Sequence, residues 1–116
     1  MDVRVDLTGD GTDEELRRLE QWLRQDRELR GVTVTALRAP DQGGEMGPVT
    51  EALHLLLEPQ GLLPAVAASL GTWAGMRRRN LRVRVTSGKK TVEIDATRLD
   101  DPDEVALRIV RELDGR

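Results

Sequence analysis

Apolar and charged residues alternate on both sides of a glycine turn between Leu81 and Ala96, and this pattern strongly constrains the fold. A two-residue turn at Gly88-Lys89 folds the two runs back on each other as a β-hairpin. The register pairs Val85 with Val92, Val83 with Ile94 and Leu81 with Ala96 on one face, and Arg84 with Glu93 and Arg82 with Asp95 on the other. Apolar residues pair on one face and residues of opposite charge pair on the other, so the hairpin predicts a sheet with one apolar and one charged face. Helices are then expected on the apolar face only.

The N-terminal third predicts a strand, a helix and a second strand. Residues 2–8 alternate apolar and polar side chains, as a half-buried strand does. A capping box at Thr12–Glu15 begins a helix, which Gly31 is expected to end. The apolar stripe of this helix consists of Leu16, Leu19, Trp22 and Leu23. Val32–Arg38 is rich in β-branched residues and forms the second strand, and two strands joined by a helix predict a parallel pair with a right-handed crossover.

The long apolar segment of the chain runs from Val49 to Met76, after a glycine-rich loop at residues 43–48. Its composition predicts one helix, or two helices broken at Pro59-Gln60-Gly61. The second half, Leu63–Trp73, is expected to be the central core helix. A ridge of small residues spaced four apart, which lets a neighbouring backbone come close, consists of Ala67, Gly71 and Gly75.

The last helix begins at Asp101–Glu104, with a capping aspartate, a first-turn proline and acids near the positive end of the helix dipole. Its buried stripe consists of Val105, Ile109, Val110 and Leu113. The predicted order is strand, helix, strand, long helix or helix pair, hairpin, helix. With 116 residues and no internal repeat, we predict a single domain over residues 1–116. Its fold class is α+β, a two-layer sandwich with a mixed four-stranded sheet and helices on one face.

The amino-acid composition argues against several classes of function. The chain has no cysteine, which excludes disulfides, thiolate catalysis and cysteine-based metal sites. The net charge of −3 gives no overall attraction to nucleic acid or anionic membranes, and two tryptophans are the only aromatic residues that could stack on bases. The N-terminus lacks a signal-peptide pattern, and Gly61–Met76 is too short to cross a bilayer. We therefore expect a cytoplasmic protein without a membrane span.

No group of residues predicts catalysis. His54 would share one side of a helix with Glu51 and Glu58, and the three could ligate a metal from that side. No other histidine or cysteine can complete such a site, so a solvent-facing stripe is the preferred interpretation. Ser69 and Ser87 have no nucleophile motif around them. We expect a non-enzymatic protein with no catalytic residue, metal or cofactor.

Basic residues gather between Arg77 and Lys90. The helix dipole accounts for a basic helix end at Arg77–Arg79, and cross-strand pairs account for Arg82 and Arg84. Two functional alternatives stay open for this cluster: an acidic protein partner and nucleic acid. The overall negative charge makes nucleic acid the less expected of the two.

Five segments in order resemble a known family. They are Met1–Val5, the Glu15-Leu16…Leu19…Trp22-Leu23 helix, Gly44–Gly47, the Gly/Ala-rich helix that reaches Trp73 before Arg77–Arg79, and Leu81–Val85. Together they resemble the first of the bacterial effector-associated constant component domains, which are small proteins of bacterial conflict systems. Glu58-Pro59-Gln60 departs from the unbroken run of small residues usual in that family. The resemblance implies a non-enzymatic component encoded beside variable effectors, often caspase-like or trypsin-like peptidases, which it recruits or restrains.

We therefore expect an adaptor or regulatory component that binds a protein effector encoded nearby. The expected partner-binding residues are Glu45, Met46, Gly47, Leu53, Leu56, Leu57, Arg82 and Arg84. A symmetric homo-oligomer formed through the apolar segment is compatible with this role. The alternatives are a nucleic-acid-binding protein that uses Arg77–Lys90, and a metal-dependent protein that uses Glu51, His54 and Glu58.

Overall fold

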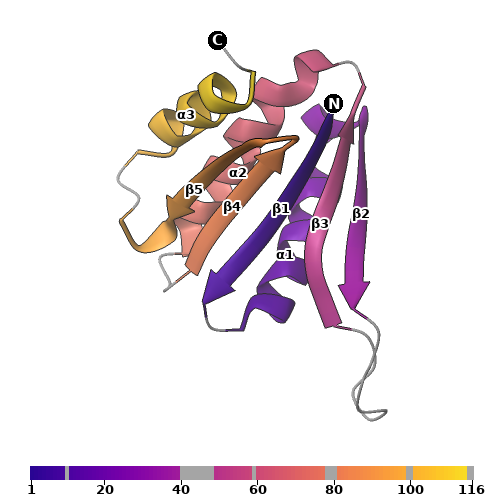
Figure 1. Cartoon of the computed structure of the whole chain (residues 1–116), viewed down its shortest axis with the longest axis vertical. Coiled ribbons are helices and arrows are strands. Elements are labelled where there is room, and N and C mark those ends of the chain that lie inside the picture. The colour runs from indigo at the N-terminus through magenta and orange to yellow at the C-terminus, as the bar shows by residue number, and fades with distance from the viewer. Residues whose placement is uncertain (10, 40–48, 59, 78–80, 99–100, 115–116) are drawn as a thin grey trace.

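The computed structural model describes the whole chain except residues 10, 40–48, 59, 78–80, 99–100 and 115–116. The strands are β1 (Asp2–Gly9), β2 (Val32–Ala39), β3 (Val49–Leu57), β4 (Leu81–Ser87) and β5 (Lys90–Asp95). The α-helices are α1 (Thr12–Gln25), α2 (Leu63–Arg77) and α3 (Pro102–Asp114). Short 3-10 turns occupy Arg27–Leu29, Gln60–Leu62 and Ala96–Arg98. The α+β class is confirmed, with one sheet and one layer of helices (Figure 1).

The sheet has five strands in the order β2-β3-β1-β4-β5, and every neighbouring pair is antiparallel. The prediction of a mixed four-stranded sheet is wrong because Val49–Leu57, the first half of the long apolar segment, is a strand and not a helix. This strand lies between β1 and β2. The predicted parallel pairing of the first two strands is wrong for the same reason.

The consecutive leucines at the end of β3 explain why the sequence does not predict a strand there. Leu53, Leu55 and Leu57 point into the core and are 0% exposed, while Leu56 on the other face is half-buried. An interior strand with apolar residues on both faces loses the period-two pattern, and a short apolar run cannot then be distinguished from a helix.

The predicted β4–β5 hairpin is confirmed with its register. Val85 pairs with Val92, and Arg84 pairs with Glu93. Gly88 has a φ of 62°, the left-handed conformation that tight hairpin turns require. The ladder ends at the pair of Arg82 and Asp95, one step before the predicted pair of Leu81 with Ala96.

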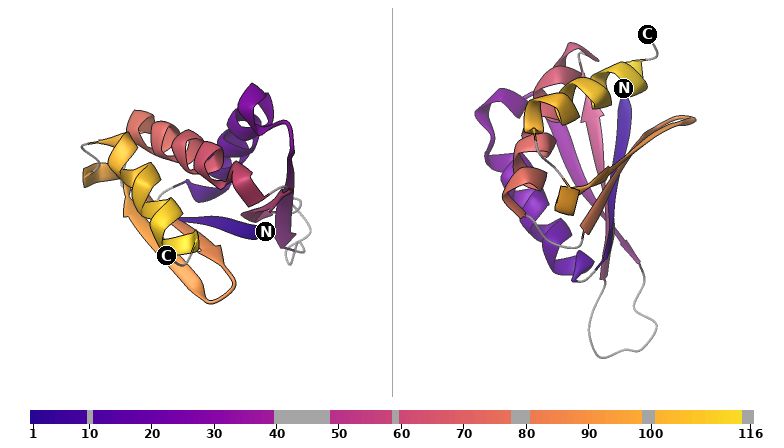
Figure 2. Two further views of the ribbon diagram at one scale, coloured as in Figure 1. Left: turned by 90° about the horizontal axis from the view of Figure 1, so that it is seen from above. Right: turned by 90° about the vertical axis from the view of Figure 1, so that its left-hand side faces the viewer.

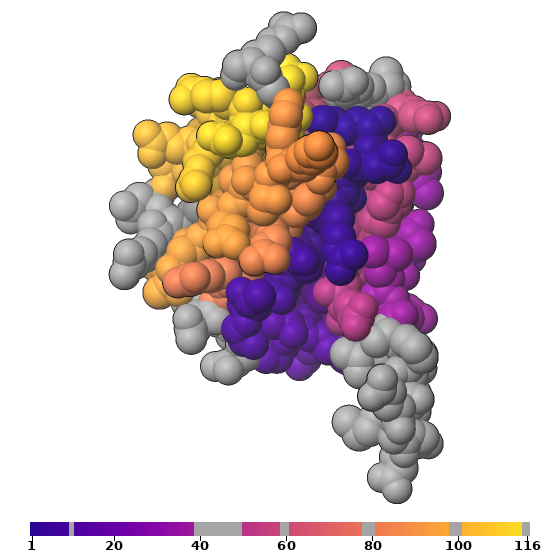
Figure 3. Space-filling view, in the orientation of Figure 1, coloured from indigo at the N-terminus to yellow at the C-terminus, as the bar shows by residue number. Residues whose placement is uncertain are grey.

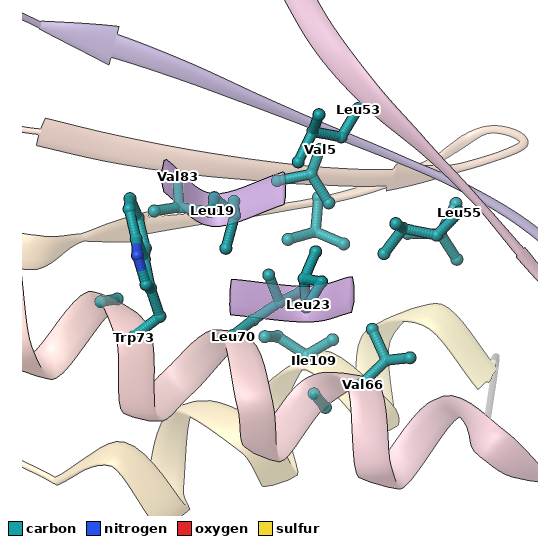
Figure 4. Close-up of a cluster of buried hydrophobic side chains, with 14 of the residues drawn as sticks. Val5, Leu19, Leu23, Leu53, Leu55, Val66, Leu70, Trp73, Val83 and Ile109 are labelled. Carbon is teal, nitrogen blue, oxygen red and sulfur yellow. The ribbon is translucent and has the colours of Figure 1, made fainter. Parts of the chain in front are cut away.

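All three helices cover one face of the sheet, as predicted (Figures 1 and 2). α1 packs on β1, β2 and β3, and α3 packs on α2 and β5. The core between the layers is aliphatic around one indole, with Val66, Leu70 and Trp73 of α2 facing Val5, Leu53, Leu55 and Val83 of the strands (Figure 4). The prediction that Leu63–Trp73 is a core helix is therefore confirmed. None of the described helices has the length and apolar character that a membrane crossing needs.

The start of α1 differs from the predicted capping box. Gly11 is the N-cap residue in a left-handed conformation with φ 65°, and no side chain caps the helix there. Glu15 instead lies under the helix layer and is 1% exposed. Its carboxylate pairs with Arg18 at 3.1 Å and with Arg77 at 3.4 Å. The Arg77 guanidinium lies 5.1 Å from the centre of the Trp73 ring, so this carboxylate ties the start of α1 to the end of α2.

Two further contacts fix the helices to their neighbours. Asp13 Oδ1 accepts a hydrogen bond of 2.8 Å from the backbone N–H of Thr50 in β3. Trp22 Nε1 donates to Ser69 Oγ at 2.8 Å, which joins α1 to α2. Ser69 therefore has a structural role.

The small-residue ridge on α2 does bring another backbone close, as predicted. A Cβ atom added at Gly71 would lie 2.7 Å from the carbonyl oxygen of Pro102, at the start of α3. The predicted cap of α3 is also confirmed, because the backbone N–H of Asp103 donates to Asp101 Oδ1 at 3.0 Å. Ile109 and Leu113 of its predicted stripe are buried, and Val105 and Val110 are half-buried.

Candidate docking surface on the open face of the sheet

No helix or strand of the described residues covers the sheet surface opposite the helices, and we call this surface the open face. Its residues come from all five strands and are mostly charged or hydroxylated. They are Asp2, Arg4, Asp6, Thr8, Thr33, Thr35, His54, Leu56, Arg82, Arg84, Thr86, Thr91, Glu93 and Asp95. Figure 3 looks onto this face, where β1 lies between β4 and β3. Because apolar and polar residues alternate along the strands, the apolar side chains are buried under the helices and the polar side chains gather on the open face.

Side chains of opposite charge are interleaved on the open face. His54 Nε2 lies 2.9 Å from Asp2 Oδ1, across the β1–β3 pair. Arg84 donates to Glu93 Oε1 from Nη2 at 2.9 Å and from Nε at 3.2 Å, across the β4–β5 pair. The surface presents fixed positive and negative groups at set spacings, which favours recognition of one complementary surface over non-specific attraction.

Asp6 is the least satisfied charged group of the open face. Its Oδ1 atom is buried and has no hydrogen-bond partner within the described part of the chain. Its Oδ2 atom is 3.8 Å from Arg4 Nε, beyond hydrogen-bond distance. A buried acceptor without a donor destabilises the fold. The Asp6 side chain as a whole is 25% exposed, so a docked molecule can approach the exposed part of the carboxylate.

The structure separates the residues that the sequence nominated for partner binding. Arg82 and Arg84 are exposed on the open face, and Leu56 lies there beside Asp2 in the neighbouring strand. Leu53 and Leu57 are completely buried in the core, so they cannot form part of a surface. Glu45, Met46 and Gly47 lie outside the described residues.

Of the open-face residues, the sequence nominated only Leu56, Arg82 and Arg84 for partner binding, and Arg4, Asp6 and His54 are among those it did not nominate. The alternation in residues 2–8 already placed Arg4 and Asp6 on the charged face of a strand. Their neighbours could not be named because β3 was read as a helix. With β3 as a strand, His54 pairs with Arg4, and the charged faces of β1, β3, β4 and β5 become continuous.

The structure does not support the metal alternative in its proposed form. Glu51 is exposed at the point where the pairing of β3 with β2 shifts register, whereas His54 lies farther along β3, opposite Arg4 and Thr35. Glu58 follows the end of that strand. Within the described ranges, no three histidine or acidic side chains are grouped so that they could hold a metal ion.

The basic cluster of the sequence is divided in space. Arg77 lies in the helix layer against Glu15 and Trp73. Arg84 lies on the other side of the sheet and is paired with Glu93. Ser87, the other candidate hydroxyl, donates to the backbone carbonyl of Asp2 at 2.9 Å. A continuous basic surface from Arg77 to Lys90, which nucleic-acid binding would need, is therefore not formed by these described residues.

Comparison with known families agrees with the resemblance seen in the sequence. The family described as Effector Associated Constant Component 1 matches residues 8–114. The chain belongs to this family. No curated protein and no solved structure matches it. The family's description implies association with effectors.

Proposed function

We propose that this effector-associated constant component is a non-enzymatic adaptor or regulatory protein that binds its effector through the open face of the sheet. The observation that carries the proposal is the difference between the sheet's two sides. One side is covered by helices, and on the other side no described residue covers the charged and hydroxylated side chains of the five strands. Family membership supports the existence of an effector partner, and the geometry supports the place where it docks.

The chemistry of the open face indicates what its partner carries. Asp6 offers a carboxylate whose side chain is 25% exposed, and Arg4 and Arg84 are about half exposed, with side-chain exposures of 52% and 48%. A fitting partner surface has a hydrogen-bond donor, preferably arginine or lysine, flanked by carboxylates. Such charge complementarity contributes mainly to specificity and to the rate of association.

The partner to test is the protein encoded next to this one, which the family resemblance suggests is a peptidase-like effector. Both proteins would be purified, and binding would be measured by isothermal titration calorimetry at micromolar concentrations. We expect a 1:1 complex that Arg84→Glu weakens at least tenfold, because the substitution places a carboxylate where the partner carries one. Arg17→Glu on the outer side of α1 makes the same change of charge and should alter the affinity less than twofold.

Two results would reject the proposal. If the neighbouring protein is not retained at micromolar concentration, the adaptor role fails. If it binds and Arg17→Glu weakens the complex as much as Arg84→Glu does, the adaptor role stands but the open face is not the docking surface.

A further inference from the structure

The outward side of α3 is a second surface, made of residues that are not part of the open face. Leu107 is 62% exposed and, with Met76, is one of two large apolar side chains exposed among the described residues. Glu104 lies three residues before it and Arg111 four residues after it, and Arg108 follows it directly, so the four residues form one exposed stripe. They line a shallow hollow of about 310 Å³. Figure 2 shows α3 alongside α2.

The charges of this stripe differ from those of α1. On α1, Arg17, Arg18 and Arg24 each pair with a carboxylate one turn earlier, at 2.6–2.8 Å. On α3, Glu104 and Arg108 have the same spacing of four residues, yet neither they nor Arg111 form an ion pair within the described part of the chain. The outward side of α3 therefore presents free charges around an exposed leucine.

The order of these charges makes the stripe complementary to itself. The acid comes first, the leucine is central, and Arg111 comes last. When two such helices lie antiparallel around a two-fold axis between Leu107 and Arg108, Glu104 of each copy lies opposite Arg111 of the other. Leu107 then packs against the aliphatic stem of Arg108, and the two helix dipoles oppose each other favourably. An isologous contact needs this self-complementarity.

We propose that the protein self-associates as a two-fold dimer through the outward side of α3. A single helix pair buries less than the roughly 1,200 Å² typical of stable complexes, so the contact is weak and transient. We expect a dissociation constant on the order of 100 µM. The residues of this stripe are not part of the open face, so a dimer formed this way uses different residues from those that dock a partner.

Sedimentation velocity from about 10 µM to 1 mM tests this directly. The wild type should shift from monomer to dimer across the range, and raising the salt concentration should weaken the dimer because its ion pairs are exposed. Leu107→Asp should leave the protein monomeric throughout. Met76→Asp removes an equally exposed apolar side chain elsewhere and should dimerise like the wild type. Circular dichroism confirms that each variant is folded.

Charge exchange provides the sharper test. Glu104→Arg gives two basic stripes that repel each other, and Arg111→Glu gives two acidic stripes that repel each other, so each variant alone should be monomeric. An equimolar mixture should dimerise, because every opposing pair is then attractive. Arg17→Glu, with the same charge change on α1, should behave as the wild type.

The proposal is overturned if the wild type remains monomeric at 1 mM. It is also overturned if a dimer forms but survives both Leu107→Asp and Arg111→Glu, since the contact then lies elsewhere. A mixture of the two charge variants that stays monomeric contradicts the antiparallel arrangement.

Discussion

Leu55 and Leu56 are neighbours in β3 with the same side chain, and they belong to opposite faces of the sheet. Leu55 points into the core and is 0% exposed, while Leu56 lies half-buried on the open face beside Asp2. The difference follows from the two-residue period of a strand. The two faces therefore have separate physical roles: the covered face supplies the free energy of folding, and the open face is the surface that we propose for partner docking.

Truncating these two leucines should give the largest contrast in stability. Leu55→Ala removes three buried carbon atoms and leaves a cavity between the layers, so we expect a loss of about 2–5 kcal/mol. Leu56→Ala should cost less than about 1 kcal/mol, because part of its surface already contacts water. Urea unfolding followed by circular dichroism measures both values. Equal losses would show that the open face is covered in solution.

The comparison extends to charged pairs on the two sides of the sheet. Glu15 is buried between Arg18 and Arg77, whereas Glu93 is exposed and pairs with Arg84. Glu15→Gln should destabilise the fold by about 1–3 kcal/mol, because it leaves the Arg77 charge half-buried without its carboxylate. Glu93→Gln should cost no more than about 1 kcal/mol. A Glu15 effect as small as that of Glu93 would mean that the helix layer opens around this carboxylate.

Close packing on the covered side predicts a smaller loss at Gly71. Alanine at this position gains about 1 kcal/mol of helix propensity, but its Cβ would lie 2.7 Å from the Pro102 carbonyl oxygen. The resulting displacement of α3 should cost about 1–3 kcal/mol, so the net effect is a loss of about 1 kcal/mol. Gly61→Ala, which meets nothing within 4 Å, is the matched control. Thermal unfolding should show a lower melting temperature for Gly71→Ala and an unchanged one for Gly61→Ala.

The smallest expected effect is the coupling between the open-face partners Arg84 and Glu93. A double-mutant cycle with alanine at each position should give about 0.2–1 kcal/mol, because both side chains are close to half exposed. A coupling energy of several kcal/mol would instead indicate that this face is shielded from water and built for stability.

The sequence predicted those parts of the fold whose patterns are local and redundant. The apolar pairs and the charge pairs between β4 and β5 both specified the same register. The capping residue Asp101 and the apolar stripe that follows it specified α3. The strand β3 could not be recognised because an interior strand with leucine on both faces has no alternation to detect. Without that strand, the pairing of Arg4 with His54 could not be predicted, and neither could a charged surface that continues from β3 across β1. Long-range pairing of this kind is set by tertiary contacts, not by local sequence.

Asp6→Ala tests the central claim most directly, because stability and partner binding should respond in opposite ways. The substitution removes a buried acceptor that has no donor, so the free energy of unfolding should stay within about 0.5 kcal/mol of the wild type or rise. Docking through the open face uses this carboxylate, so the affinity for the neighbouring effector, measured by calorimetry on the same sample, should fall at least tenfold. Unchanged affinity with unchanged stability would contradict the claim that the open face binds the effector.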